Sequence, residues 1–183
     1  MILFIDTHLN DIVIILYSSG QIIERKIIKN EKHHSTIIMP TLTKLLNDRI
    51  PESIIVVNGP GSFTSVRLGV TIAKTLAYTW NIPIRTINYL EALAVSNQEK
   101  IGEVGFNDNN GYYVGKFDDQ NNLIGEYNYI SNNDFENYKI KNTVRTDINV
   151  NYTEVIEYAL KKKAINPHEV NPVYIKKLDV EKW

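Results

Sequence analysis

The chain has 183 residues, 43% of them hydrophobic, and its 20 basic and 21 acidic side chains leave a net charge of −1. A nearly neutral chain has no global field that would draw it onto nucleic acid or an anionic membrane, and the absence of cysteine excludes disulfides, thiolate metal sites and cysteine nucleophiles. No stretch approaches the roughly 20 apolar residues that span a bilayer, so we expect a cytoplasmic globular protein with no membrane contact.

The first part of the chain predicts three strands and a helix. The β-type segments cover residues 2–5, 12–17 and 21–28. The opening apolar run has no basic leader and meets Asp6 at once, so we interpret it as a strand and not as a signal peptide. A helical pattern follows over 34–47 and contains Pro40, which should kink the helix or mark a late start.

A glycine-containing loop joins the next predicted strand, 54–57, directly to a helical pattern over 64–80. Its glycines, Gly59 and Gly61, would let the backbone approach a ligand closely and aim free N–H groups at it. The loop is neither a Walker A loop nor a dinucleotide-binding fingerprint, because the spacing and the Gly-Lys-Ser/Thr ending are missing. Ser62 or Thr64 could equally cap the helix with no ligand present. A ligand cradle and a capped packing elbow both stay open on the residues alone.

The rest of the chain predicts a smaller second half. The expected strands are 84–87, 103–106, 112–117 and 123–130, and the expected helices are 89–95, 131–138 and 153–163. Ser131 and Thr153 are the expected caps of the last two helices. Residues 171–183, which include Pro172, are expected to form an extended tail.

The order of these elements predicts the fold. Three antiparallel strands followed by alternating helices and strands, with Asp6 after the first strand, resemble a ribonuclease-H-like half, and two such halves make the actin-like (ASKHA) α/β fold. We expect a complete N-terminal lobe over residues 1–95 and a reduced C-terminal lobe over 96–183, with the tail packing back.

The helix over 64–80 is apolar around most of its circumference. Its polar stripe consists of Arg67, Thr71, Lys74 and Tyr78, whereas a surface helix shows a single apolar stripe. Such a helix is either sandwiched in the core, which is the default, or covers a partner.

Candidate chemical groups are few. Asp6 and Thr7 could hold a metal–phosphate complex or simply form a polar turn. Two histidine ligands on one helical face need a spacing of four, but Ile38 lies four residues after His34, so we expect no metal site. No serine–histidine–aspartate arrangement or pair of catalytic carboxylates can be inferred.

Several motifs together resemble the TsaB (YeaZ) family of bacterial tRNA threonylcarbamoyladenosine synthesis. They are Ile5-Asp6-Thr7, His34-Ser35, Met39-Pro40, Gly59-Pro60-Gly61-Ser62-Phe63-Thr64, Arg67-Leu68-Gly69, Ala73-Lys74, Leu76-Ala77-Tyr78, Ile82-Pro83, Leu90-Glu91-Ala92-Leu93-Ala94 and Pro172-Val173-Tyr174-Ile175-Lys176. The match is dense over residues 1–95, sparse to about 165, and returns at the tail. Two departures are Ser65-Val66 in place of Gly-Leu, and His8 in place of a small hydroxyl residue.

The resemblance implies a protein without catalytic activity or a cofactor of its own, with ATP or ADP expected only at the level of a complex. It implies a scaffold for the catalytic paralogue TsaD, which modifies adenosine 37 of ANN-decoding tRNAs. The ATPase TsaE is the further expected partner, tRNA is contacted indirectly, and a homodimer forms through the same helices, 34–47 and 64–80. The alternative is a small actin-like nucleotide-dependent transferase or kinase that uses Asp6 and the loop 59–64.

These implications name two sets of residues. The vestigial phosphate loops would consist of Asp6, Thr7, Gly59, Gly61, Ser62 and Thr64. The pairing surface would consist of His34, Ile38, Thr41, Leu45, Arg67, Val70, Ala73, Lys74 and Ala77.

Overall fold

The structure is a computed structural model that describes residues 1–29, 33–99 and 102–176. Its first sheet has five strands in the order β3-β2-β1-β4-β5. These are β1 (Ile2–Asp6), β2 (Ile12–Ser18), β3 (Gln21–Ile28), β4 (Ser53–Val57) and β5 (Ile84–Ile87). β1 pairs antiparallel with β2 and parallel with β4, so the sheet is mixed. Strands β1 and β4 are almost continuously apolar because helices cover both faces of the sheet.

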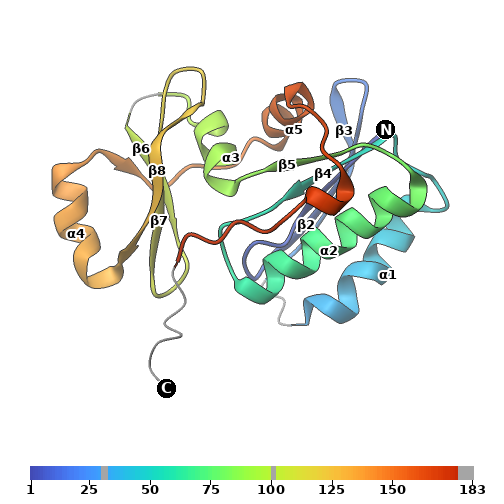
Figure 1. Cartoon of the computed structure of the whole chain (residues 1–183), viewed down its shortest axis with the longest axis horizontal. Coiled ribbons are helices and arrows are strands. Elements are labelled where there is room, and N and C mark those ends of the chain that lie inside the picture. Colours follow the sequence, from blue (N-terminus) through green and yellow to red (C-terminus); the bar gives the residue numbers. More distant parts are fainter. Residues whose placement is uncertain (30–32, 100–101, 177–183) are drawn as a thin grey trace.

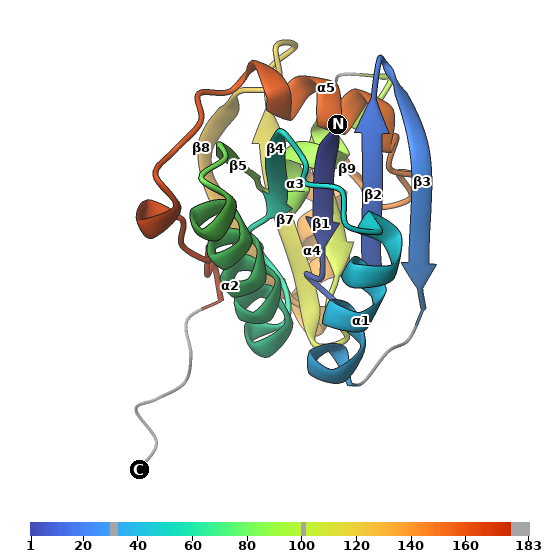
Figure 2. The ribbon, with the colours of Figure 1, turned by 90° about the vertical axis from the view of Figure 1, so that its right-hand side faces the viewer.

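Helices α1 (His34–Leu46) and α2 (Phe63–Trp80) lie side by side on one face of the first sheet (Figure 2). Their buried side chains join those of β1, β2 and β4 in one hydrophobic cluster. Helices α3 (Tyr89–Ser96) and α5 (Tyr152–Lys161) contribute to a second cluster on the opposite face. The first sheet is therefore the middle layer of a three-layer arrangement.

The second sheet has four strands in the order β8-β7-β6-β9. They are β6 (Glu103–Asn107), β7 (Gly111–Phe117), β8 (Leu123–Ser131) and β9 (Val144–Arg145), and helix α4 (Asn132–Lys141) packs on β7 and β8. The chain then returns to the first sheet, where Ile165 bridges to Ile84, and the short 3-10 helix η1 (Pro167–Glu169) packs against α2 (Figure 1).

The predicted elements agree with the observed ones to within one to three residues, with four differences. Helix α1 continues through Pro40 from His34, so the late start is wrong. The Ser62 side chain makes no capping bond to α2, and Asn151, not Thr153, caps α5. Strand β9 was not expected. Residues 177–183 of the expected tail lie outside the described residues.

Candidate functional site

The glycine loop between β4 and α2 holds other segments of the same chain. Val173 donates its N–H to the Asn58 carbonyl over 2.7 Å, and Ser62 donates its N–H to the His8 carbonyl over 2.7 Å. Gly59 has a φ of +118°, and the Val173 carbonyl oxygen lies 2.5 Å from where a Cβ at Gly59 would stand. A Cβ at Gly61 would overlap the His8 carbonyl oxygen. The close approach that these glycines allow is therefore made by the protein's own backbone.

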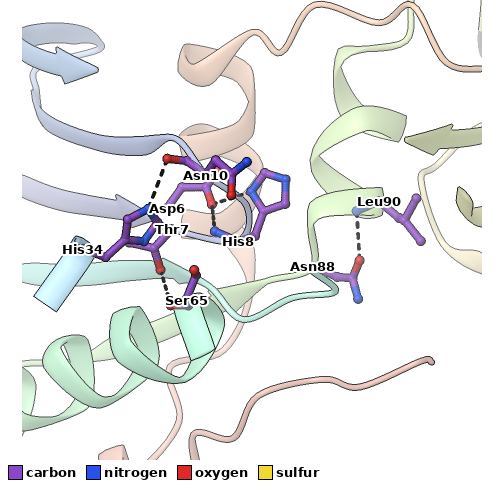
Figure 3. A network of polar contacts seen from close by, with 8 residues as sticks. All are labelled: Asp6, Thr7, His8, Asn10, His34, Ser65, Asn88 and Leu90. Carbon is purple, nitrogen blue, oxygen red and sulfur yellow. Dashed lines mark hydrogen bonds and ion pairs between the residues drawn. The ribbon is translucent and has the colours of Figure 1, made fainter. Parts of the chain in front are cut away.

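Asp6 is the last residue of β1 and Thr7 comes directly after it; both are almost completely buried (Figure 3). Oδ1 of Asp6 lies 2.7 Å from Nδ1 of His8 and accepts the backbone N–H of His8 over 3.0 Å. The Thr7 hydroxyl donates to the Ser65 carbonyl over 2.7 Å, which ties β1 to the first turn of α2. Both polar groups thus stabilise the chain where β1 ends, and the polar-turn interpretation accounts for their contacts.

A cleft of about 760 Å³ lies beside this loop. Asp6, Gly61 and Ser62 line it, whereas Thr7, Gly59 and Thr64 are outside its lining. The structure therefore brings only half of the expected phosphate-loop residues to one cleft.

The His8 ring forms part of the cleft wall together with aromatic side chains. It stacks on Tyr89 at 3.6 Å between ring centroids and meets the edge of Phe106 at 5.3 Å. Burial, followed by the Asp6 and Asp11 carboxylates, raises the pKa of Tyr89. Sequence reasoning noted His8 as a departure from the family pattern, and nothing local in the sequence predicts that its ring contacts Tyr89 and Phe106.

The expected pairing surface on α1 and α2 divides into core and surface residues. Ile38, Val70, Ala73 and Ala77 are at most 2% exposed and pack on the first sheet. His34 is also buried, and its Nε2 lies 3.1 Å from the Asn10 carbonyl oxygen. These side chains lie on the helix faces that meet the sheet. Thr41, Leu45, Arg67 and Lys74 remain at least partly exposed.

A strip of half-buried apolar side chains lies beside that core. On α2 it comprises Leu68, Ile72 and Leu76, at a spacing of four residues, and on α1 it comprises Ile37 and Leu45. Sequence reasoning missed four of these five. The spacing of four was a usable signal, but on a helix that is apolar nearly all round it does not tell the buried row from the exposed one.

Arg67 on α2 is exposed but fixed in position. Its guanidinium carbon lies 3.7 Å from the Phe63 ring centroid, and its Nε donates to the Tyr174 hydroxyl over 2.7 Å. Lys74 donates to the Val170 carbonyl over 3.1 Å. Both cations of α2 therefore lie against the returning chain, which also packs on α2 through η1.

Within residues 1–29, 33–99 and 102–176, no three His, Asp or Glu side chains gather as a metal site would require, and no helix is both long and apolar enough to cross a membrane.

Comparisons with known proteins find matches whose descriptions all refer to threonylcarbamoyl modification of tRNA. A profile of the family "TsaD: tRNA N6-adenosine threonylcarbamoyltransferase" matches residues 21–105. A Bacillus subtilis (strain 168) protein described as tRNA threonylcarbamoyladenosine biosynthesis protein TsaB is 38% identical over 131 residues, covering 67% of this chain and 57% of that protein. A Buchnera aphidicola protein of the same description is 32% identical over 71 residues, covering 36% of this chain and 32% of that protein. The chain thus spans little more than half the length of the first of these relatives.

The solved structure described as YeaZ from Pseudomonas aeruginosa has a TM-score of 0.76 to this chain at 16% identity, covering 94% of this chain and 98% of that one. A second P. aeruginosa structure, described as similar to peptidase YEAZ, also has a TM-score of 0.76, at 15% identity, and covers 96% and 99%. The two mixed sheets and these likenesses confirm the expected actin-like α/β fold.

Proposed function

Because these likenesses support the TsaB/YeaZ family for this chain, we propose that it is a non-catalytic subunit of the machinery that installs threonylcarbamoyl on adenosine 37 of ANN-decoding tRNAs. In this proposal α1 and α2 pair with a catalytic subunit of the TsaD type, and a second copy of the chain competes for the same helices. TsaE and tRNA enter through the assembly, which works in the cytoplasm. Residues 1–95 and 96–183 act as its two lobes.

The half-buried apolar strip is the observation that carries the pairing surface. Leu68, Ile72 and Leu76 contact the core cluster but keep part of their apolar surface exposed. Ridges formed by residues four apart are the features that interdigitate when one helix packs on another. Burying this remaining surface would contribute about 25 cal/mol for each Å² removed from water.

The contacts of Asp6 and of the glycine loop support the non-catalytic part of the proposal. An acid that holds a metal–phosphate complex needs its carboxylate directed at that ligand, whereas Oδ1 of Asp6 accepts two contacts from His8. The loop N–H of Ser62 likewise donates to the His8 carbonyl. Oδ1 of Asp6 is therefore occupied by His8, and the Ser62 N–H would have to break its bond to the His8 carbonyl before it could bind a nucleotide.

A charge placed on the strip tests the proposal. We expect Ile72→Glu to prevent co-elution with the TsaD-type paralogue of the same organism, because a carboxylate buried in the interface has no partner there. Ile124→Glu is the matched control, since Ile124 is 48% exposed on β8, away from α1 and α2. The urea midpoint of both variants should match that of the unchanged protein. Absence of a complex with the unchanged protein would overturn the proposal.

The alternative function, a nucleotide-dependent transferase or kinase, is favoured by one observation. The cleft is large enough for a small ligand, and Asp6, Gly61 and Ser62 line it. This function requires Mg-ATP to raise the melting temperature of the isolated chain and Asp6→Ala to abolish that rise. If Mg-ATP leaves the melting temperature unchanged, this alternative fails.

A further inference from the structure

Strand β3 forms one edge of the first sheet and is the outermost strand on the right of Figure 2. The opposite edge strand, β5, is covered by the returning chain, where Ile165 donates its N–H to the Ile84 carbonyl over 3.0 Å. Within residues 1–29, 33–99 and 102–176, no backbone hydrogen bond joins the outer edge of β3 to another segment. Such an edge presents a row of N–H and C=O groups that can pair with another extended chain.

Most of β3 has the regular geometry that an added strand needs. The register with β2 shifts near the start of β3, and this bulge leaves Ile23 without a partner on β2. From Glu24 to Ile28, β3 then pairs in regular order with residues 12–16 of β2. A bulge twists an edge away from an incoming strand, but it acts only where the extra residue lies. The run from Glu24 to Ile28 is therefore the part of the edge that is open to pairing.

The side chains exposed along this edge are apolar and basic. Ile23 and Ile27 are 46% and 37% exposed. Arg25 and Lys26 are exposed as well, and neither forms an ion pair or a side-chain hydrogen bond with another described residue. The acid of the strand, Glu24, is already paired with Arg49 over 2.6 Å. The edge thus offers two cations and no unpaired carboxylate, which favours an acidic partner strand.

The two cations lie on opposite faces of the sheet. Arg25 and Ile27 are on the face that α3 and α5 cover, because their partners on β2 belong to that hydrophobic cluster. Ile27 also lines the cleft, as does Lys29 directly after the strand. Lys26 is on the other face, since its partner on β2 belongs to the cluster of α1 and α2. A strand beside β3 would therefore meet a cation on either face and an apolar side chain at Ile27.

From this edge we propose that β3 binds an extended acidic peptide segment of another protein, which adds a strand to the first sheet. Main-chain hydrogen bonds supply the affinity, and carboxylates that meet Arg25 and Lys26 supply the selectivity. A peptide fits this edge better than a nucleic acid, because it satisfies the open backbone groups and covers Ile27 as well as the cations. The inference is independent of the proposed function, since α2 packs on β1, β4 and β5, away from β3.

The test titrates the peptide Val-Val-Glu-Glu-Val-Val-Glu-Glu, whose paired glutamates place a carboxylate on each face, into the isotopically labelled full chain. We expect slower hydrogen exchange at the amides of alternate β3 residues, because the added strand bonds to alternate residues only. The same peptide with lysine in place of glutamate should bind at least about tenfold more weakly. Two further versions carry N-methyl groups on one or the other set of alternate residues. We expect one of them to lose binding, since its pairing N–H groups are blocked.

Variants of the chain complete the test. Arg25→Gln with Lys26→Gln should raise the dissociation constant of the glutamate peptide by about fivefold. Lys139→Gln with Lys141→Gln is the matched control, because it removes two exposed cations from the end of α4 and should leave the constant unchanged within about twofold.

Three outcomes would overturn the inference. The glutamate peptide could fail to bind at millimolar concentration, or both N-methylated versions could bind as well as the parent, which would show attraction by charge alone. Self-association of the isolated chain that protects the β3 amides would assign the edge to a second copy. None of these outcomes bears on the complex tested with Ile72→Glu, so the proposed function is judged separately.

Discussion

The Nδ1 atom of His8 lies 2.7 Å from Oδ1 of Asp6, and the backbone N–H of His8 donates to the same oxygen. The two side chains are only 9% and 3% exposed. The imidazole also stacks on Tyr89 at the start of α3. The acid at the end of β1 therefore anchors the ring that connects the β1–β2 loop to α3 and, through Phe106, to the second sheet.

We expect Asp6→Ala to destabilise the fold, because it removes the acceptor of two buried contacts and leaves His8 without its partner. Removing one member of a buried polar pair costs about 2–4 kcal/mol. Urea denaturation measures this change in the free energy of unfolding. Asp6→Asn, which keeps an acceptor oxygen, should cost less. An Asp6→Ala protein of unchanged stability would show that the carboxylate does not anchor the loop.

Gly61→Ala should destabilise the protein more than Gly20→Ala does. Both glycines have positive φ, +157° and +80°, so alanine is strained at either position. A Cβ at Gly61 would also overlap the His8 carbonyl oxygen, whereas a Cβ at Gly20 meets nothing within 4 Å. We expect a loss of about 1 kcal/mol at Gly20 and at least about twice that at Gly61. Equal losses in thermal or urea unfolding would contradict the packing role of Gly61.

The order of elements was predictable because strands and amphipathic helices leave periodic patterns in the sequence. The three strands before α1, the loop between β4 and α2, and the ends of α2 follow directly from such patterns. Capping was less predictable, since Asn151 and Thr153 are both acceptable caps near the start of α5, and only the backbone geometry decides between them.

The site was harder to predict because its contacts join residues far apart in the sequence. The hydrogen bond between Val173 and Asn58 brings the backbone of the returning chain against Gly59, and no local pattern in the sequence predicts this contact. On α2, the buried row with Ala73 and the half-buried row with Ile72 are both apolar. Their separation depends on how the helix is rotated over the sheet, which tertiary packing determines.

The turn between β7 and β8 should show a measurable dependence on pH. The side-chain amide of Asn122 donates to the Asp118 carboxylate, as do the backbone N–H groups of Asn122 and Gln120. These bonds hold the pKa of Asp118 below its ordinary value of 3.8. Because the folded-state pKa is the lower one, the contribution of the turn is complete above the ordinary pKa and is lost as the pH falls through the folded one.

Titration of the Asp118 carboxyl by nuclear magnetic resonance measures this pKa. Asn122→Ala should move it back toward the ordinary value, because the largest of the three causes is removed. A midpoint at or above 3.8 in the unchanged protein would contradict the assigned hydrogen bonds.

The returning segment 173–176 should hold the two sheets in a fixed relation. Val173 donates its N–H to Asn58, which directly follows β4 of the first sheet. Ile175 packs in the hydrophobic cluster of β6 and β7 in the second sheet. Lys176 donates to the Tyr129 hydroxyl of β8 over 3.3 Å. Tyr174, between them, is held by Arg67. We expect Tyr174→Ala to loosen this connection, because it removes both the hydrogen bond and the contact with the Phe63 ring.

Distances between spin labels on the two sheets measure the loosening, and the absence of native cysteine makes the labels specific. Gln21→Cys on β3 and Gln120→Cys in the β7–β8 turn place both labels at exposed positions. Tyr174→Ala should broaden the distance distribution. Tyr78→Ala is the matched control, since Tyr78 is 65% exposed on α2 and contacts His168 rather than the segment 173–176. Equal distributions in all three proteins would mean that the packing of α3 and His8 alone fixes the two sheets, since those contacts are unchanged in every variant.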